Sequence, residues 1–176
     1  MKRLPLLIAA IIMICSPAYA FRQKEVNVWS ESMNKDVPVT VIIPDNYRKA
    51  KEFPVIYLLH GHGGNHTSWA SKGVVGNLSD QYGIIFAIPD GGHDSWYFDS
   101  TFTPEYQYET FVSSELVKFM DENYKTVKDR RGRAVTGLSM GGHGGLFLGI
   151  RHQDVFGSMG STSGGVDFRP FPKKWG

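Results

Sequence analysis

A serine lies at the centre of a glycine-flanked pentapeptide, Gly137-Leu138-Ser139-Met140-Gly141, which fits the pattern G-x-S-x-G. This pattern can place a serine hydroxyl on a sharp turn between a strand and a helix, where it can attack a carbonyl carbon. A β-rich run (133–136) precedes the turn and a helix-compatible run (142–151) follows it. Glycines on either side admit close backbone approach. The sequence therefore predicts that Ser139 is a nucleophile.

A second glycine-rich segment, Leu58-Leu59-His60-Gly61-His62-Gly63-Gly64, closes an apolar run. Loops of this kind can aim backbone amides at the oxygen of a reacting carbonyl. In the nucleophile interpretation, one donor is the amide of Met140, the residue after the serine, and the other comes from this loop.

The same loop allows a metal interpretation, because His60, His62 and His66 form an H-x-H-x3-H array. A zinc site usually adds a carboxylate or a further histidine, and the intervening residues offer neither. We therefore predict no metal and no cofactor, and keep a metal-dependent hydrolase as the less favoured alternative.

The elements that must position these loops alternate along the chain. Residues 25–29 and 37–43 predict an opening hairpin, and residues 53–59, 83–88, 133–138 and 156–161 predict further strands. Helices are expected over about 67–82, over 108–124 and over 141–151, the second from an apolar residue at every third or fourth position. Strands separated by helices favour an α/β fold with a mainly parallel sheet.

The first twenty residues predict a secretory signal peptide. Lys2 and Arg3 precede an apolar run from Leu4 to Ile14, and Ala18-Tyr19-Ala20 supplies a cleavage site. A membrane anchor is the alternative, but the run is shorter than the roughly 20 residues that span a bilayer. Cleavage would remove Cys15, the single cysteine, which excludes thiol catalysis from residues 21–176. We expect an exported, periplasmic or secreted, protein with one domain over 21–176.

Charge gives no support for a nucleic-acid partner. The formal net charge is +2 at pH 7, and loss of Lys2 and Arg3 leaves as many basic as acidic residues. After signal cleavage no stable membrane insertion is expected either. The oligomeric state is not predicted.

Taken together, these motifs resemble the esterase family of α/β-hydrolases that includes tributyrin-type, feruloyl and acetyl-xylan esterases, S-formylglutathione hydrolases and mycolyltransferases. The matching pieces include the two glycine-rich segments, Pro89-Asp90-Gly91-Gly92, Ser95-Trp96-Tyr97 and Ser161-Thr162-Ser163-Gly164-Gly165. The resemblance implies an α/β-hydrolase three-layer sandwich with a mainly parallel sheet. It also implies that Ser139 is the catalytic residue, that the amides of His62 and Met140 form the oxyanion hole, and that Trp96 and Tyr97 line a substrate pocket. Ordinary loop packing is the alternative role for these two aromatic residues.

One departure from the family concerns the base. In α/β-hydrolases the acid and the histidine follow the serine, but His143 and His152 are the only histidines after Ser139. His143 lies just after the serine on the helix that follows it, where packing or support of neighbouring site residues is the better role, and His152 lies roughly 20 Å along that helix. Asp167 could mimic the acid, but without a base it would orient nothing. We therefore expect a C-terminally truncated chain that lacks the last strands, the acid and the histidine.

The expected whole protein is a serine esterase that hydrolyses carbohydrate or small-molecule esters through an acyl-enzyme. The chain alone should be weakly active or inactive. The rival from another class is a non-catalytic carbohydrate-binding module on a hydrolase scaffold, which the intact Ser139 and glycine loop disfavour.

Overall fold

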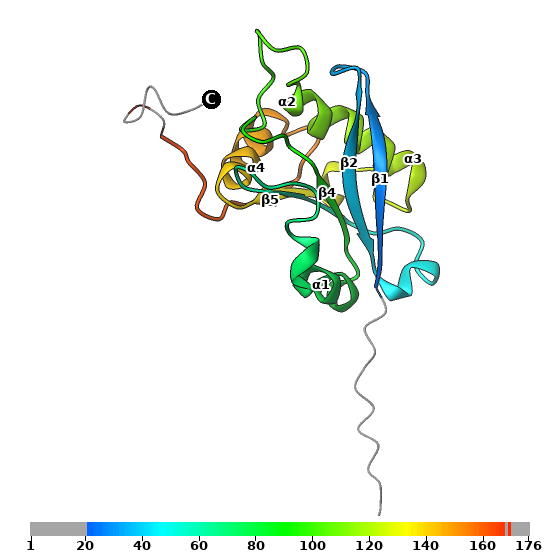
Figure 1. The fold of residues 1–176 in the computed structure, drawn as a ribbon. Helices are drawn as coiled ribbons and strands as arrows, with labels where there is room; N and C mark the ends of the chain where they lie inside the picture. The colour runs from blue at the N-terminus through cyan, green and yellow to red at the C-terminus, as the bar shows by residue number, and fades with distance from the viewer. Residues whose placement is uncertain (1–20, 168, 170–176) are drawn as a thin grey trace, which may run out of the picture.

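The centre of the molecule is a six-stranded sheet in the order β1-β2-β4-β3-β5-β6 (Figure 1). The structure, a computed structural model, describes residues 21–167 and 169, so the expected signal peptide over 1–20 lies outside the described residues. The strands are β1 (Arg22–Ser30), β2 (Lys35–Ile43), β3 (Val55–Leu59), β4 (Ile85–Pro89), β5 (Arg133–Gly137) and β6 (Ser158–Met159).

Strand β2 is antiparallel to both of its neighbours, whereas the pairings of β4 with β3, β3 with β5 and β5 with β6 are parallel. The opening hairpin is confirmed, with Asn34 at φ 52° in its turn. Strands β3 and β5 pair from Val55–Arg133 to Leu59–Gly137, so they end together. That shared edge receives both glycine-rich segments.

Helices cover both faces of the sheet. Helix α1 (Val74–Tyr82) packs on one face, where Val75 joins Leu58, Phe86 and Ile88 in a small apolar cluster. The other face carries the main core, which receives α3 (Leu116–Asn123) and α4 (Met140–Arg151). Alternate residues of β3 and β4 point to the two clusters, as expected of strands buried on both faces. This is the predicted three-layer α/β arrangement.

The long helix expected over 108–124 is present as a continuous run with an irregular centre. It consists of α2 (Tyr108–Thr110), a π-helical segment (Phe111–Glu115) and α3. The apolar stripe is confirmed as a core face, because Phe111, Leu116 and Met120 are fully buried. Short 3-10 segments lie at Asp45–Arg48, Ala70–Lys72 and Arg130–Gly132.

Two predicted boundaries are wrong. The helix expected from about residue 67 begins at Val74, because Gly73 (φ 70°) is left-handed and separates α1 from the preceding 3-10 turn. The strand expected over 156–161 contains only Ser158 and Met159, although an isolated bridge between Leu138 and Thr162 extends the contact with the serine turn. Among residues 21–167 and 169, no helix has the length and apolarity needed to cross a membrane.

Candidate active site

Ser139 occupies the turn between β5 and α4, as the motif predicted. Its backbone has φ 56° and ψ −115°, a conformation that is uncommon for a residue with a side chain and is typical of strained functional turns. The amide of Ser139 donates to the Thr162 carbonyl (2.9 Å), and the Ser139 carbonyl accepts from the His143 amide (2.9 Å). Met140 is the first residue of α4, so its amide belongs to the positive end of the helix dipole.

The glycines of the motif are required by close backbone contacts. A Cβ atom at Gly141 would clash with the Leu59 carbonyl and would lie 2.7 Å from the His60 carbonyl oxygen. A Cβ atom at Gly137 would likewise collide with the Leu59 carbonyl and with the backbone of Gly141. The end of β3 is therefore pressed against the serine turn, and this contact brings the two glycine-rich segments together.

The loop after β3 reaches Ser139 through Gly61. A Cβ atom at Gly61 would lie 3.4 Å from the Ser139 Cβ. The following turn is closed by a hydrogen bond from the Gly64 amide to the Gly61 carbonyl (3.0 Å), with Gly63 at φ 70°. His62 lies within this turn, and its side chain is exposed. The predicted oxyanion-hole residues, His62 and Met140, thus lie on the two segments that flank the serine.

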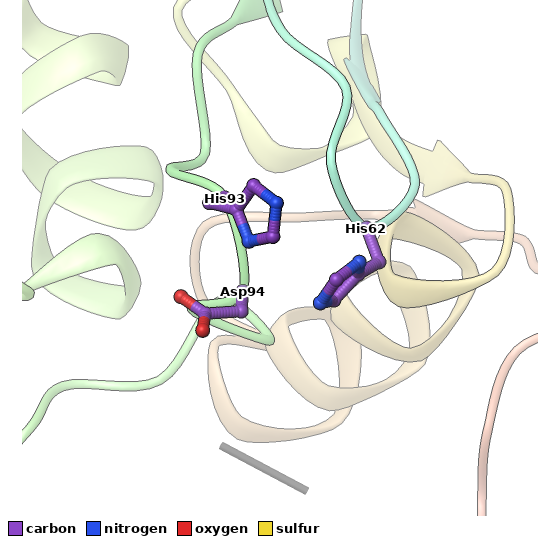
Figure 2. A group of neighbouring side chains, drawn as sticks. All are labelled: His62, His93 and Asp94. Carbon is purple, nitrogen blue, oxygen red and sulfur yellow. The ribbon is translucent and has the colours of Figure 1, made fainter.

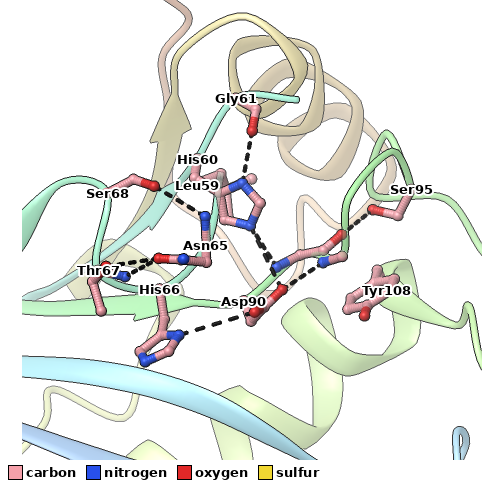
Figure 3. A network of polar contacts seen from close by, with 12 residues as sticks. Leu59, His60, Gly61, Asn65, His66, Thr67, Ser68, Asp90, Ser95 and Tyr108 are labelled. Atoms are coloured by element: carbon pink, nitrogen blue, oxygen red, sulfur yellow. Dashed lines mark hydrogen bonds and ion pairs between the residues drawn. The ribbon is translucent and has the colours of Figure 1, made fainter. Parts of the chain in front are cut away.

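His60 is a structural residue of this loop. Its Nε2 accepts from the Gly91 amide (2.8 Å), which leaves Nδ1 to donate to the Gly61 carbonyl (2.8 Å) (Figure 3). The ring is buried, and both of its nitrogens are committed to backbone groups. These bonds connect the loop after β3 to the loop after β4.

The H-x-H-x3-H array does not assemble as one ligand set. His66 faces Glu25 (3.6 Å) and Asp90 (3.9 Å), and Figure 3 shows its contact with Asp90. Burial would raise the pKa of Asp90, but the hydrogen bond from the Gly92 amide (2.7 Å) and the adjacent rings of His60 and His66 hold that pKa below its usual range. His62, the middle histidine, points instead to the loop after β4.

Trp96 and Tyr97 have different positions. Both have left-handed backbones (φ 53° and 61°). Trp96 lines a cavity of about 880 Å³ together with Asp94, Phe98, Phe102 and Tyr106 among others. The expectation that Tyr97 lines a pocket needs correction, because its side chain is fully buried and its hydroxyl donates to the His60 carbonyl (3.2 Å). The two neighbouring side chains therefore lie in different places, that of Trp96 at the cavity and that of Tyr97 in the core.

The cavity is linked to the serine turn by aromatic packing. Trp96 and Phe98 contact the ring of His143 with centroid distances of 5.7 and 5.0 Å, and Phe147 stacks on it at 5.6 Å. The His143 Nδ1 donates to the Gly165 carbonyl (2.8 Å). His143 therefore has the packing role that the sequence indicated. His152 bonds Glu109 (2.9 Å) at the far end of α4.

His93 and Asp94 also lie in this region, and no sequence motif predicted them. The Gly63 amide donates to the His93 carbonyl (2.8 Å), and the His62 and His93 rings meet edge to face with centroids 4.6 Å apart. Their position directly after a buried strand was the available signal, because neighbouring parallel strands deliver their following loops to one edge of the sheet.

The parallel core, the antiparallel β2 and the serine turn at the carboxyl end of β5 define an α/β-hydrolase fold. The structure of FphF, a fluorophosphonate-binding serine hydrolase of Staphylococcus aureus, has this fold: it superposes with a TM-score of 0.78 over 89% of this chain and 62% of its own, at 18% identity. Residues 30–176 match the family described as "Putative esterase", and the chain belongs to that family.

Two curated relatives have informative names. The chain is 37% identical over 136 residues to Esterase MT1326 of Mycobacterium tuberculosis, which covers 74% of this chain and 30% of the relative. It is 33% identical over 169 residues to an endo-1,4-beta-xylanase/feruloyl esterase of Xylanibacter ruminicola, which covers 84% of this chain and 23% of the relative. The chain thus spans less than a third of the length of either relative.

Proposed function

We propose that the protein containing this chain is a serine carboxylic-ester hydrolase, with Ser139 as its nucleophile. The observation that carries the proposal is the strained backbone of Ser139 (φ 56°, ψ −115°) at the start of α4, against the glycine loop of β3. A strained turn of this kind persists only where the surrounding structure holds it, and it exposes the hydroxyl to substrate.

In the proposed reaction, the Ser139 oxygen attacks the ester carbonyl carbon while its proton passes to a base. The carbonyl oxygen becomes an oxyanion, and the amides of His62 and Met140 donate to it. One such donor typically stabilises the transition state by about 3–4 kcal/mol. Collapse of the intermediate breaks the ester C–O bond, the alcohol leaves with a proton, and water then hydrolyses the acyl-enzyme.

The base is proposed to lie outside this sequence, as part of a longer protein. Four of the six histidines have structural partners: His60, His66, His143 and His152. The two others, His62 and His93, contact each other, and both precede Ser139, whereas the acid and base of α/β-hydrolases follow the nucleophile. Asp167 is bonded to Arg169 (2.8 Å).

The proposed substrates are acyl esters of carbohydrates or other small esters. The aromatic lining of the cavity, which includes Trp96, suits a flat or apolar acyl group or a sugar face. The name of the Xylanibacter ruminicola relative, a xylanase/feruloyl esterase, supports the carbohydrate ester class. The signal-like start of the sequence supports export to where such polymers occur.

Labelling with a fluorophosphonate probe tests the nucleophile. Because the base is proposed to lie outside this sequence, we expect a covalent adduct to form slowly on Ser139 in excess probe, found by mass spectrometry and lost in Ser139→Ala. The matched control Ser114→Ala, at an exposed helical serine, should label like the parent chain. Retention on polysaccharide with no adduct even after prolonged exposure to excess probe would contradict the esterase and favour the binding module.

Hydrolysis of p-nitrophenyl acetate tests whether the chain lacks the catalytic base. A serine without its base is a weak nucleophile, so we expect the chain alone to turn the ester over slowly, if at all. Rapid turnover that Ser139→Ala abolishes would contradict the proposed truncation and leave the nucleophile intact.

A further inference from the structure

Three potential metal ligands converge beside the serine turn from two separate loops. His62 follows β3, and His93 and Asp94 follow β4 (Figure 2). One ligand atom of each side chain lies within 4.8 Å of the other two. Both imidazoles are exposed, and the carboxylate is partly buried.

The backbone already holds these loops together. Strands β3 and β4 pair in parallel, so their carboxyl ends lie at the same edge of the sheet. The amide of Gly63, the residue after His62, donates to the carbonyl of His93 (2.8 Å), so the two stretches of backbone that carry the imidazoles are hydrogen-bonded to each other. Gly92 (φ 71°) turns the second loop, and its amide is fixed by Asp90 (2.7 Å). Ligation therefore needs side-chain rotation but no rearrangement of the backbone.

The carboxylate has an outer partner. Asp94 and Tyr106 line the same cavity, and after burial the charge of Asp94 is the main cause that raises the pKa of the Tyr106 phenol. Polar neighbours of a ligating carboxylate can orient it and strengthen metal binding in metalloproteins.

The donor set selects the class of ion. Two imidazole nitrogens and one carboxylate oxygen suit Zn²⁺ and similar divalent transition metals, whereas Ca²⁺ and Mg²⁺ prefer oxygen ligands alone. Bonds of about 2.1 Å in tetrahedral geometry place ligand atoms about 3.4 Å apart. The side chains must close from within 4.8 Å to that spacing, a change that rotation of the exposed histidines supplies.

We propose that His62, His93 and Asp94 bind a single Zn²⁺ ion, with a fourth position open to water or a ligand. The site differs from the array of His60, His62 and His66, because it takes only the middle histidine of that array and adds two residues from the loop after β4. Bound zinc would link the loop after β3 to the loop after β4. The first of these lies against Ser139 at Gly61, and the second lines the aromatic cavity with Asp94. Zinc binding by these three residues does not depend on esterase activity.

Calorimetric titration of the whole chain with ZnCl₂ tests the site. We expect one zinc per chain. The zinc affinity should be reduced at least about tenfold in His93→Ala and in Asp94→Asn, since loss of a group that only hydrogen-bonds a metal ligand already has effects of this size. His152→Ala removes a histidine at the far end of α4 and should bind like the parent. Zinc should also raise the thermal unfolding temperature of the parent and of His152→Ala equally, and that of His93→Ala by less at the same zinc concentration.

Three outcomes would overturn the proposal. The first is unchanged zinc affinity in both His93→Ala and Asp94→Asn. The second is loss of zinc binding in His66→Gln with retention in His93→Ala, which would move the metal to the other array. The third is half a zinc per chain with zinc-dependent dimerisation. Circular dichroism of each variant before titration confirms that the fold is kept, and Co²⁺ absorption spectra report the coordination number independently.

Discussion

The Gly91 amide donates to Nε2 of His60 over 2.8 Å, and this bond fixes which nitrogen of the ring carries the proton. Because Nδ1 then donates to the Gly61 carbonyl, one buried side chain joins the loops after β3 and β4. Those loops carry the proposed oxyanion donor and the proposed zinc ligands. The position of both sites therefore depends on a residue that is proposed to take part in neither.

Replacement of His60 by leucine should destabilise the protein and disturb the loop. A buried donor or acceptor left without a partner costs about 1–3 kcal/mol, and His60→Leu leaves the Gly91 amide without its acceptor, whereas the Gly61 carbonyl keeps only the Gly64 amide. Urea unfolding measures the loss. His60→Gln, which can present an acceptor to Gly91, should lose less, and equal losses in both variants would show that packing alone matters.

Substitution of Gly141 by alanine should disrupt the serine turn. The added methyl group would meet the carbonyls of Leu59 and His60, and neither backbone group can move without distorting β3. The matched control is Gly73→Ala, at a left-handed glycine with open space around it, where only a backbone cost of roughly 1–2 kcal/mol is expected.

Thermal unfolding and fluorophosphonate labelling distinguish the two variants. We expect Gly141→Ala to lose more stability than Gly73→Ala and to label more slowly at Ser139. A Gly141→Ala variant with parental stability and labelling would show that the turn tolerates a side chain, and the close contact with Leu59 would then be no constraint.

The serine turn was predictable because its requirements are local. Glycine on both sides of Ser139, a β-rich run before it and helix-compatible residues after it lie within one short segment. The burial of the helix around Leu116 was predictable for the same reason, since its apolar period is visible in the sequence.

The remaining features depend on contacts between distant segments. His62 contacts His93 only because β3 and β4 are neighbours in the sheet, and the sequences of the two loops do not determine the order of the strands. The burial of Tyr97 follows from left-handed backbones at two bulky residues, which sequence propensity disfavours. The late start of α1 depends on the left-handed conformation of Gly73.

The buried ring of His143 should make folding sensitive to mild acid. Burial lowers the pKa of His143, an effect that outweighs the smaller upward influence of its bond to Gly165. The unfolded chain takes up the proton below about pH 6.5, whereas the folded protein resists it. The stability contributed by the neutral ring is thus complete above that pH and is lost as the pH falls toward the lowered pKa.

Urea unfolding at pH 7.5 and at pH 5.5 checks this expectation. His143→Gln keeps a donor for the Gly165 carbonyl and removes the titration, so its stability should fall less between the two pH values. The control Ser114→Ala should keep the parental pH dependence. The linkage would be absent if His143→Gln and the parent lost equal stability on acidification.

Trp96 should contribute to recognition of aromatic acyl groups, and Tyr97 should not contact them. Methyl ferulate, added as a competitor, should slow fluorophosphonate labelling of Ser139, because an aromatic ring in the cavity would contact Trp96. Aromatic contacts contribute about 0.5–1.5 kcal/mol beyond burial, so Trp96→Ala should weaken the protection roughly two- to tenfold. Tyr97→Phe removes only the hydrogen bond to the His60 carbonyl and should leave the protection unchanged. If Trp96→Ala left the protection at the parental level, Trp96 would have the packing role that its contact with His143 also allows, and the acyl group would bind elsewhere.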